Sequence, residues 1–173
     1  MRLSYKLSMD NAIDLAEQLA KPFESCSLKA YWDVAGYPTN GWGNLLSRQR
    51  KIDVMKRLSL SSMQADEWLQ KTYPPISQDV ADKMFVVNLN RAFSSVRRLV
   101  KWRLSSEQLA ALIDFTFNLG AGKLQVSTLL KLINRGELNA AAEEFKKWNK
   151  AGGRVYRGLT LRRLAEYNLF SGY

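Results

Sequence analysis

Three residues near the start of the chain have the types and the spacing for acid–base chemistry on a sugar. Eight residues separate Glu24 from Asp33, and five residues separate Asp33 from Thr39. Cleavage of a glycosidic bond needs two carboxylates, because one protonates the leaving oxygen and the other serves the opposite face of the sugar. The hydroxyl of Thr39 is suited to hold a water there. We therefore take Glu24, Asp33 and Thr39 as candidate catalytic residues.

The two carboxylates are expected to have different roles. The proton donor must keep its proton near neutral pH, and partial burial favours that state. Glu24 follows Phe23 and an apolar helix stripe, which makes it the better candidate for the acid, whereas Asp33 lies on a polar turn and should stay ionised. A carboxylate gap of roughly 6.5–9.5 Å predicts inversion and one of about 5 Å predicts a covalent intermediate. The sequence spacing does not measure this gap.

The composition narrows the chemistry and the partners. The chain has 173 residues, with 26 basic and 16 acidic residues, a net charge of +10 and no histidine. A Ser-His-Asp triad, a His-ligated metal and a His general base are therefore excluded. Cys26 is the only cysteine, so an internal disulfide is impossible, and we interpret it as a small buried hydrophobe. The positive charge predicts an anionic partner: nucleic acid, an anionic membrane or an acidic polymer such as the bacterial cell wall.

Local patterns in the first part of the chain predict the elements that position the candidate residues. Asp10 is expected to cap a helix over about 11–24, because apolar residues recur there at three- and four-residue steps. Aromatic and branched residues around a Gly-containing turn predict a hairpin over 28–32 and 37–42. The stretch 48–73 is predicted to be partly helical, either a lid or a passive insertion.

The rest of the chain is predicted to be helical. Capping and periodicity indicate helices over about 77–100, 105–120, 127–134, 138–148 and 160–170. Pro74-Pro75 is interpreted as the boundary between a small lobe, about residues 10–75, and a helical lobe, about residues 76–173. Helices with one small sheet predict an α+β fold, mostly helical, in a single domain of residues 1–173.

Four blocks of residues carry a longer pattern. They are Phe23-Glu24 with Leu28-Lys29-Ala30-Tyr31, Asp33, Gly36-Tyr37, Thr39 and Gly41-x-Gly43; Ile76 to Asp82; Phe115 to Gly122 with Ser127 to Leu130; and Trp148 to Gly153 with Gly158-Leu159, Arg162-Arg163 and Glu166. Together, and in this order, they resemble the phage-type lysozymes, the endolysins that cut bacterial peptidoglycan. The resemblance spans roughly residues 13 to 170.

The resemblance implies a lysozyme-like fold, with a small antiparallel sheet lobe, a larger helical lobe and an active-site cleft between them. It implies that Glu24 is the general acid and that Asp33 and Thr39 hold the attacking water. The implied reaction is inverting cleavage of the β-1,4 bond from N-acetylmuramic acid to N-acetylglucosamine, without metal or cofactor. Phe117 and Asn118 match positions that line the family's sugar cleft. Packing in the core explains Phe117 as well, and a place before a Gly C-cap explains Asn118 equally well.

Four positions near the candidate site depart from the family pattern. Pro22 is unusual just before the acid and predicts a kink or an early helix end. Ser25 stands where a left-handed Gly is usual, Asn40 where an apolar branched residue is common, and Asn44 where a histidine is typical. The catalytic groups remain, but the resemblance does not specify the catalytic efficiency or the pH optimum of a chain with these four departures. A catalytically weak or inactive lysozyme-derived wall-binding protein is therefore the alternative function.

The stretch from Lys146 to Arg163 holds seven Lys or Arg residues and no acid. It is a solvated face, or a contact for wall-peptide carboxylates, anionic lipid or lipopolysaccharide; Arg162-Arg163 followed by Glu166 also suits structural ion pairs. A nucleic-acid-binding protein is the rival class, although no binding motif accompanies the charge. A chitin-cutting enzyme is a closer alternative. The expected partner is bacterial peptidoglycan and the expected state is a monomer.

The first residues have a charge but no long apolar run behind it. We therefore predict no signal peptide and no membrane span. The expected location is the host cytoplasm until another protein opens the membrane, and then the periplasm and cell wall. The sequence does not specify the host, the wall chemotype, or a phage or prophage origin.

Overall fold

The computed structural model describes the backbone of residues 2–172 and the side chains of residues 11–172. Contacts divide the chain into two compact units: the sheet unit, Glu24–Val87, and the helical unit, which joins the chain before Glu24 to the chain after Val87. The division therefore lies within helix α4 (Gln78–Leu99), not at Pro74-Pro75 as predicted. The reason is that the first helix packs along a later helix of the helical unit.

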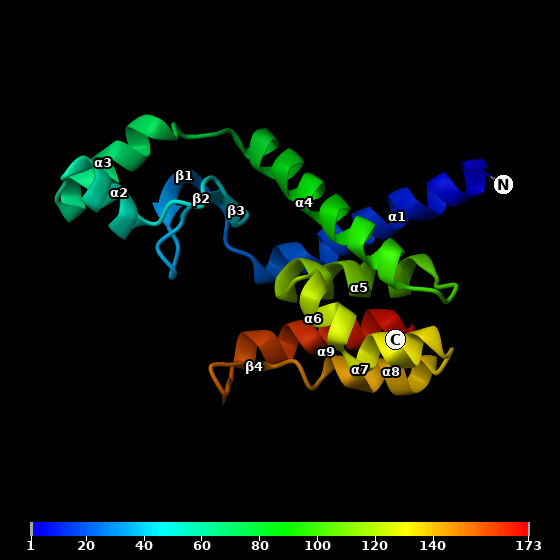
Figure 1. The fold of residues 1–173 in the computed structure, drawn as a ribbon. Coiled ribbons are helices and arrows are strands. Elements are labelled where there is room, and N and C mark those ends of the chain that lie inside the picture. The colour runs from blue at the N-terminus through cyan, green and yellow to red at the C-terminus, as the bar shows by residue number, and fades with distance from the viewer. Residues whose placement is uncertain (1, 173) are drawn as a thin grey trace. The chain divides into compact units, whose positions relative to one another are not determined.

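The sheet unit is built around a three-stranded antiparallel sheet of β1 (Ser27–Trp32), β2 (Pro38–Gly41) and β3 (Asn44–Leu45), in that order (Figure 1). Helices α2 (Lys51–Leu58) and α3 (Ser62–Thr72) follow, and then the first part of α4. The predicted hairpin is confirmed. The third strand was not predicted, since its two residues are too few to show a periodic pattern.

Side-chain contacts fasten α3 to the first strand. The rings of Trp32 and Trp68 stack with centroids 6.4 Å apart and planes 11° from parallel. The amide of Gln70 donates to the carbonyl of Ala30 at 2.7 Å. Ser61 caps α3, and the chain leaves the helix before Pro74-Pro75. The stretch 48–73 is therefore an integral part of the sheet unit.

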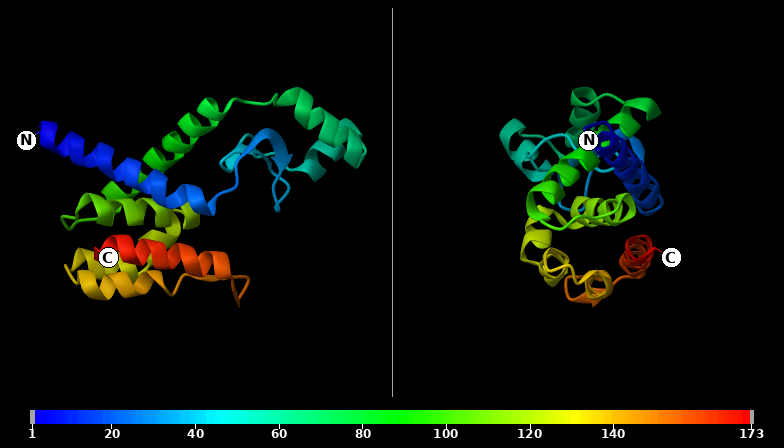
Figure 2. Two further views of the ribbon diagram at one scale, coloured as in Figure 1. Left: turned by 180° about the vertical axis from the view of Figure 1, so that it is seen from behind. Right: turned by 90° about the vertical axis from the view of Figure 1, so that its right-hand side faces the viewer.

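The helical unit surrounds α5 (Ser106–Leu119), whose Leu112, Ile113 and Phe115 are fully buried. Helix α1 (Arg2–Ala20) and helix α9 (Arg157–Ser171) pack on α5. Between α5 and α9 the chain forms α6 (Ala121–Val126), α7 (Thr128–Asn134), α8 (Leu138–Phe145) and a hairpin of β4 (Lys150–Ala151) and β5 (Arg154–Val155). Figures 1 and 2 show α7, α8 and α9 grouped on the same side of α5.

Several predicted boundaries in the helical unit are wrong. Helix α1 already runs from Arg2, so Asp10 does not begin it, and the side chain of Asp10 lies outside the described side chains. Helix α8 ends at Phe145 rather than Trp148, and α9 begins at Arg157 rather than near Thr160. The intervening Lys150–Val155 hairpin and α6 are too short for a clear periodic signal.

Two helix ends were predicted correctly from local chemistry. The α-helical part of the first helix stops at Ala20, and Pro22 lies in a 3₁₀ turn, η1 (Lys21–Phe23), because proline lacks the N–H that a continuing helix needs. Helix α5 has the predicted bounds of about 105–120, because Ser105 and Gln108 form a capping box at its start and Gly120 ends it. Among the described residues, no helix has both the length and the apolar character needed to cross a bilayer.

Candidate active site

Asp33 follows β1 directly and is fixed by the turn that it begins. One carboxylate oxygen, Oδ1, accepts the backbone N–H groups of Ala35 at 2.9 Å and Tyr37 at 2.8 Å. An Asp that accepts backbone N–H groups two residues ahead holds its own turn in place. The second oxygen, Oδ2, accepts no hydrogen bond from the described residues. One oxygen therefore orients the side chain and the other is available as an acceptor.

Thr39 lies on β2, in register with Tyr31 on β1. Residues directly opposite each other in an antiparallel pair present their side chains on the same face of the sheet. The hydroxyl of Thr39 donates to the carbonyl of Tyr37 at 3.2 Å, and the residue is only 4% exposed. Because its proton is engaged by this carbonyl, the oxygen faces its surroundings as an acceptor.

Glu24 is half-buried and comes immediately after η1, where Pro22 has already ended the α-helix. Its carboxylate acts electrostatically on Tyr31. The pKa of the Tyr31 phenol is raised, first by burial and then by the negative charges of Asp33, Glu24 and Cys26. Of the candidate residues predicted from sequence, Glu24 and Asp33 therefore both act electrostatically on Tyr31, and Thr39 is its register partner on the neighbouring strand.

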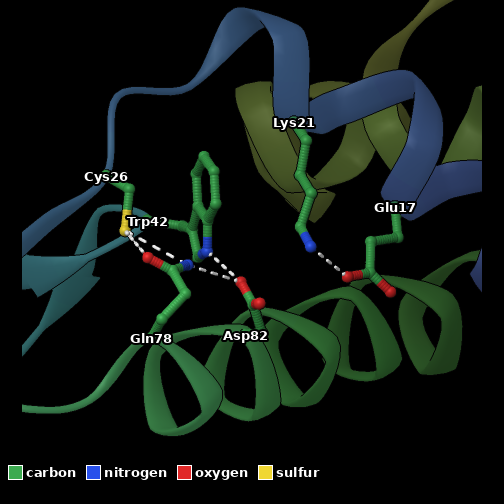
Figure 3. A network of polar contacts seen from close by, with 6 residues as sticks. All are labelled: Glu17, Lys21, Cys26, Trp42, Gln78 and Asp82. Atoms are coloured by element: carbon green, nitrogen blue, oxygen red, sulfur yellow. Dashed lines mark hydrogen bonds and ion pairs between the residues drawn. The ribbon is translucent and has the colours of Figure 1, made fainter.

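A polar network in the sheet unit holds the sheet against α4 (Figure 3). Trp42 Nε1 donates to Asp82 Oδ1 at 2.6 Å, and Gln78 Nε2 donates to the same oxygen at 3.0 Å. The thiol of Cys26 contacts the amide of Gln78 at 3.8–3.9 Å. Cys26 is only half-buried. The prediction of a buried hydrophobe is wrong, because Cys26 lies at this polar junction.

Figure 3 also shows an ion pair of the helical unit, in which Lys21 Nζ lies 2.7 Å from Glu17 Oε1 near the end of α1.

The phage lysozyme family matches residues 21–166 of this sequence. The chain belongs to the phage lysozyme family. The endolysin of Bacillus phage B103 is 42% identical over 154 residues, covering 88% of this chain and 51% of that protein. The endolysin of Acyrthosiphon pisum secondary endosymbiont phage 1 is 30% identical over 156 residues, covering 88% of this chain and 92% of that protein.

The fold agrees with this membership. The crystal structure of a P22 lysozyme mutant is 25% identical, with a TM-score of 0.68, over 90% of this chain and 94% of that one. The predicted α+β fold, mostly helical with a small antiparallel sheet, is confirmed. The chain spans about half the length of the Bacillus phage relatives that it matches, 51% for B103 and 52% for PZA.

The departures from the phage lysozyme pattern fit the local backbone. Among the described non-glycine residues only Ser59 has a positive φ, so the chain leaves η1 through Ser25 without the left-handed conformation that would require Gly. Asn40 and Asn44 are register partners on β2 and β3, and the Asn44 amide donates to Asn40 Oδ1 at 3.4 Å. The two polar departures therefore contact each other.

Phe117 and Asn118, the predicted sugar-binding residues, lie near the end of α5 in the helical unit. Asn118 Oδ1 accepts from Arg163 Nη2 at 3.1 Å, and the C-cap of the helix is Gly120, with φ +87°. The Phe117 ring centre lies 5.9 Å from Arg162 Cζ. These contacts hold both side chains in place, and their role in sugar binding stays a prediction.

Two buried ion pairs lie next to these residues, and the suggestion that Arg162-Arg163 form structural pairs is confirmed. Arg162 Nε and Nη2 donate to the two carboxylate oxygens of Asp114 at 3.0 and 2.6 Å. Arg163 Nη2 lies 2.7 Å from Glu166 Oε1. Burial raises the pKa of Glu166 well above its usual range; the charge of Asp114 adds to this and that of Arg163 opposes it. Asp114 was missed, although an acid within an apolar helix stripe signals a buried partner.

Proposed function

We propose that this chain is the muramidase part of an endolysin, which cleaves the β-1,4 bond between N-acetylmuramic acid and N-acetylglucosamine and so lyses the host cell. The observation that carries the proposal is that a member of the phage lysozyme family has Asp33 held by two backbone N–H groups at the end of β1 and Thr39 on the neighbouring strand β2, in register with Tyr31. The named relatives are endolysins, which supports the same class of reaction.

In the proposed reaction Glu24 donates its proton to the leaving glycosidic oxygen. Asp33 Oδ2 accepts a proton from the attacking water, and Thr39 Oγ accepts a hydrogen bond from that water. The water oxygen bonds to the anomeric carbon as the old C–O bond breaks. Attack from the face opposite the leaving group inverts the anomeric configuration. The fixed orientation of Asp33, held by two backbone N–H groups, supports its role as base.

Product analysis tests this function. Purified peptidoglycan is digested, reduced with borohydride and hydrolysed, and the reduced amino sugars are identified. Reduced muramic acid as the new end, formed first as the α-anomer in NMR spectra, is the expected result. Reduced glucosamine would overturn the muramidase assignment in favour of cleavage at the other bond. Sedimentation of the protein with the wall, with no new reducing ends, would favour the wall-binding alternative.

The proposed location is the host cytoplasm before lysis and the cell wall after the membrane opens. Expression in a bacterium with a susceptible wall tests it. Turbidity should fall only when chloroform is added to permeabilise the membrane. Lysis during expression without chloroform would contradict the cytoplasmic stage.

A second proposal concerns anionic lipid. Of the seven basic residues between 146 and 163, Lys146 and Lys147 pair with Glu143 and Glu144, and Arg162 and Arg163 are buried in ion pairs. The other three, on and after the β4–β5 hairpin, are exposed and have no ion pair with a described residue: Lys150, Arg154 and Arg157.

Two large apolar side chains accompany these cations. Val155 is 60% exposed and Tyr156 is 51% exposed. We call residues 150–157 the basic hairpin surface. Unpaired cations beside exposed apolar groups suit the interface of an anionic membrane, where headgroups face the charges and acyl chains receive the apolar groups. The favoured occupant is therefore an anionic lipid leaflet, such as that of the opened host membrane.

Vesicle sedimentation tests the basic hairpin surface. The double variant Lys150→Gln/Arg154→Gln should bind vesicles of phosphatidylglycerol and phosphatidylcholine about 30-fold more weakly than the wild type, at ~1 kcal/mol per cation. The matched control, Lys123→Gln/Lys131→Gln, removes two exposed lysines elsewhere in the helical unit and should bind normally. Equal loss in both variants, or retention of DNA without vesicle binding, would overturn the proposal.

A further inference from the structure

Tyr31 belongs to the candidate site, but the roles proposed for Glu24 and Asp33 leave it without a function. It stands on β1 opposite Thr39, and is 37% exposed. Its phenol forms no hydrogen bond with a described residue, and its pKa is raised by burial and by the negative charges of Asp33, Glu24 and Cys26. Tyrosine can donate and accept a hydrogen bond, so a phenol without a hydrogen-bond partner among the described residues has a donor to offer.

The hydrogen bonds of Asp33 and Thr39 show which hydrogen-bond partner an attacking water between them would still need. Asp33 Oδ2 is an acceptor, and Thr39 Oγ is an acceptor because its proton goes to the carbonyl of Tyr37. A water held by both would use its two protons, one toward each oxygen. One lone pair must point at the anomeric carbon, which leaves the second lone pair without a donor. Glu24 cannot serve as that donor, since its proton is needed by the leaving oxygen on the other face.

The phenol of Tyr31 is suited to be the missing donor, because of its position in the strand register and because of its raised pKa. Tyr31 and Thr39 are directly opposite each other on β1 and β2, so their side chains lie on the same face of the sheet. Burial and the charges of Asp33, Glu24 and Cys26 raise the pKa of Tyr31, so that the phenol keeps its proton throughout the neutral range. Tyr31 therefore remains a hydrogen-bond donor at neutral pH.

We propose that Tyr31 is a positioning residue, whose phenolic O–H donates a hydrogen bond to the water held by Asp33 and Thr39 and so turns the other lone pair toward the anomeric carbon. This inference rests on the proposed function. The water oxygen forms the bond to carbon, one water proton passes to Asp33, and the proton of Glu24 leaves with the glycosidic oxygen. Tyr31 keeps its proton throughout and acts through orientation alone.

Comparison of Tyr31→Phe with Tyr73→Phe tests the proposal. Both substitutions remove one phenolic oxygen from the sheet unit, and Tyr73 packs edge-on against Trp68 with ring centres 6.3 Å apart. Tyr31→Phe should lower kcat about tenfold with KM unchanged, the worth of one hydrogen bond made in the transition state. Tyr73→Phe should keep the wild-type kcat. A Tyr31→Phe enzyme within about twofold of wild type would overturn the proposal.

Binding in an inactive background separates orientation from substrate contact. Glu24→Gln and Glu24→Gln/Tyr31→Phe should sediment equally with purified peptidoglycan, because the proposed bond is to water and not to sugar. Weaker sedimentation of the double variant would overturn the role assigned to Tyr31. A wild-type protein that releases no reducing ends would instead contradict the proposed function, so the two failures are distinguishable.

Discussion

The buried ion pair between Arg162 and Asp114 gives a large predicted effect on stability. Arg162 is 3% exposed and the Asp114 side chain is not exposed at all, with a two-pronged contact at 3.0 and 2.6 Å. Asp114→Asn keeps the shape of the side chain but removes its charge. An amide oxygen replaces only one of the two acceptors, and its NH₂ group turns a donor toward the guanidinium.

The expected loss follows from burial. Removing one partner of a buried pair typically costs about 3–5 kcal/mol, because the other charge stays in a poorly solvated site. For a chain of this length that corresponds to a fall in Tm of roughly 6–20 °C. Glu137→Gln is the matched control in the same unit. The pair of Glu137 with Arg135 has an N–O distance of 4.0 Å and side chains 51% and 69% exposed. Its loss should cost about 0–1 kcal/mol.

Urea unfolding followed by far-UV circular dichroism measures both variants under the same conditions. We predict that Asp114→Asn shifts the midpoint strongly while Glu137→Gln leaves it nearly in place, with little change in the slope against urea. A loss below about 1 kcal/mol for Asp114→Asn would refute the reasoning that burial sets the cost.

Three further predictions concern single side chains. Trp42→Phe removes the 2.6 Å bond to Asp82 and should lower the free energy of unfolding by about 1.5–3 kcal/mol in urea melts; an unchanged midpoint would contradict this. Gly41→Ala should cost about 1–2 kcal/mol, because Gly41 has φ +55°, and a neutral result would show that the strand relaxes. Because the pKa of Glu166 is raised in the folded state, the folded state binds the Glu166 proton more tightly than the unfolded state does. This preference stabilises the folded state fully at acidic pH, and the stabilisation is lost as the pH rises above about 4.3, the ordinary pKa of a glutamate. Between about pH 4 and 7 the wild type should therefore lose stability relative to Glu166→Gln, and parallel thermal melts that diverge in the opposite sense would contradict it.

Features that depend on neighbouring residues were predictable from the sequence. Ser61 and Ser105 cap their helices because their side chains need only reach the backbone three residues ahead. Pro22 ends the first α-helix because its ring leaves no backbone N–H to continue the helical hydrogen bonds. The hairpin that carries Asp33 follows from alternating residue types around a Gly-containing turn.

Features that depend on distant partners were not predictable in the same way. Asp114 and Arg162 are 48 positions apart, and nothing local couples them. The pairing of Tyr31 with Thr39 depends on an irregular register in β1 between Ser27 and Tyr31, which alternation alone does not reveal. Cys26 contacts Gln78 through tertiary packing, so its residue type alone gave the wrong environment.

The most direct test of the central claim compares wild type with Glu24→Gln on purified peptidoglycan, by the rate at which new reducing ends appear. Glutamine keeps the shape of the side chain but cannot donate the proton. We predict steady release by the wild type, and loss of release by Glu24→Gln with binding to the wall retained. Equal release by both proteins would contradict the role of Glu24 as the acid.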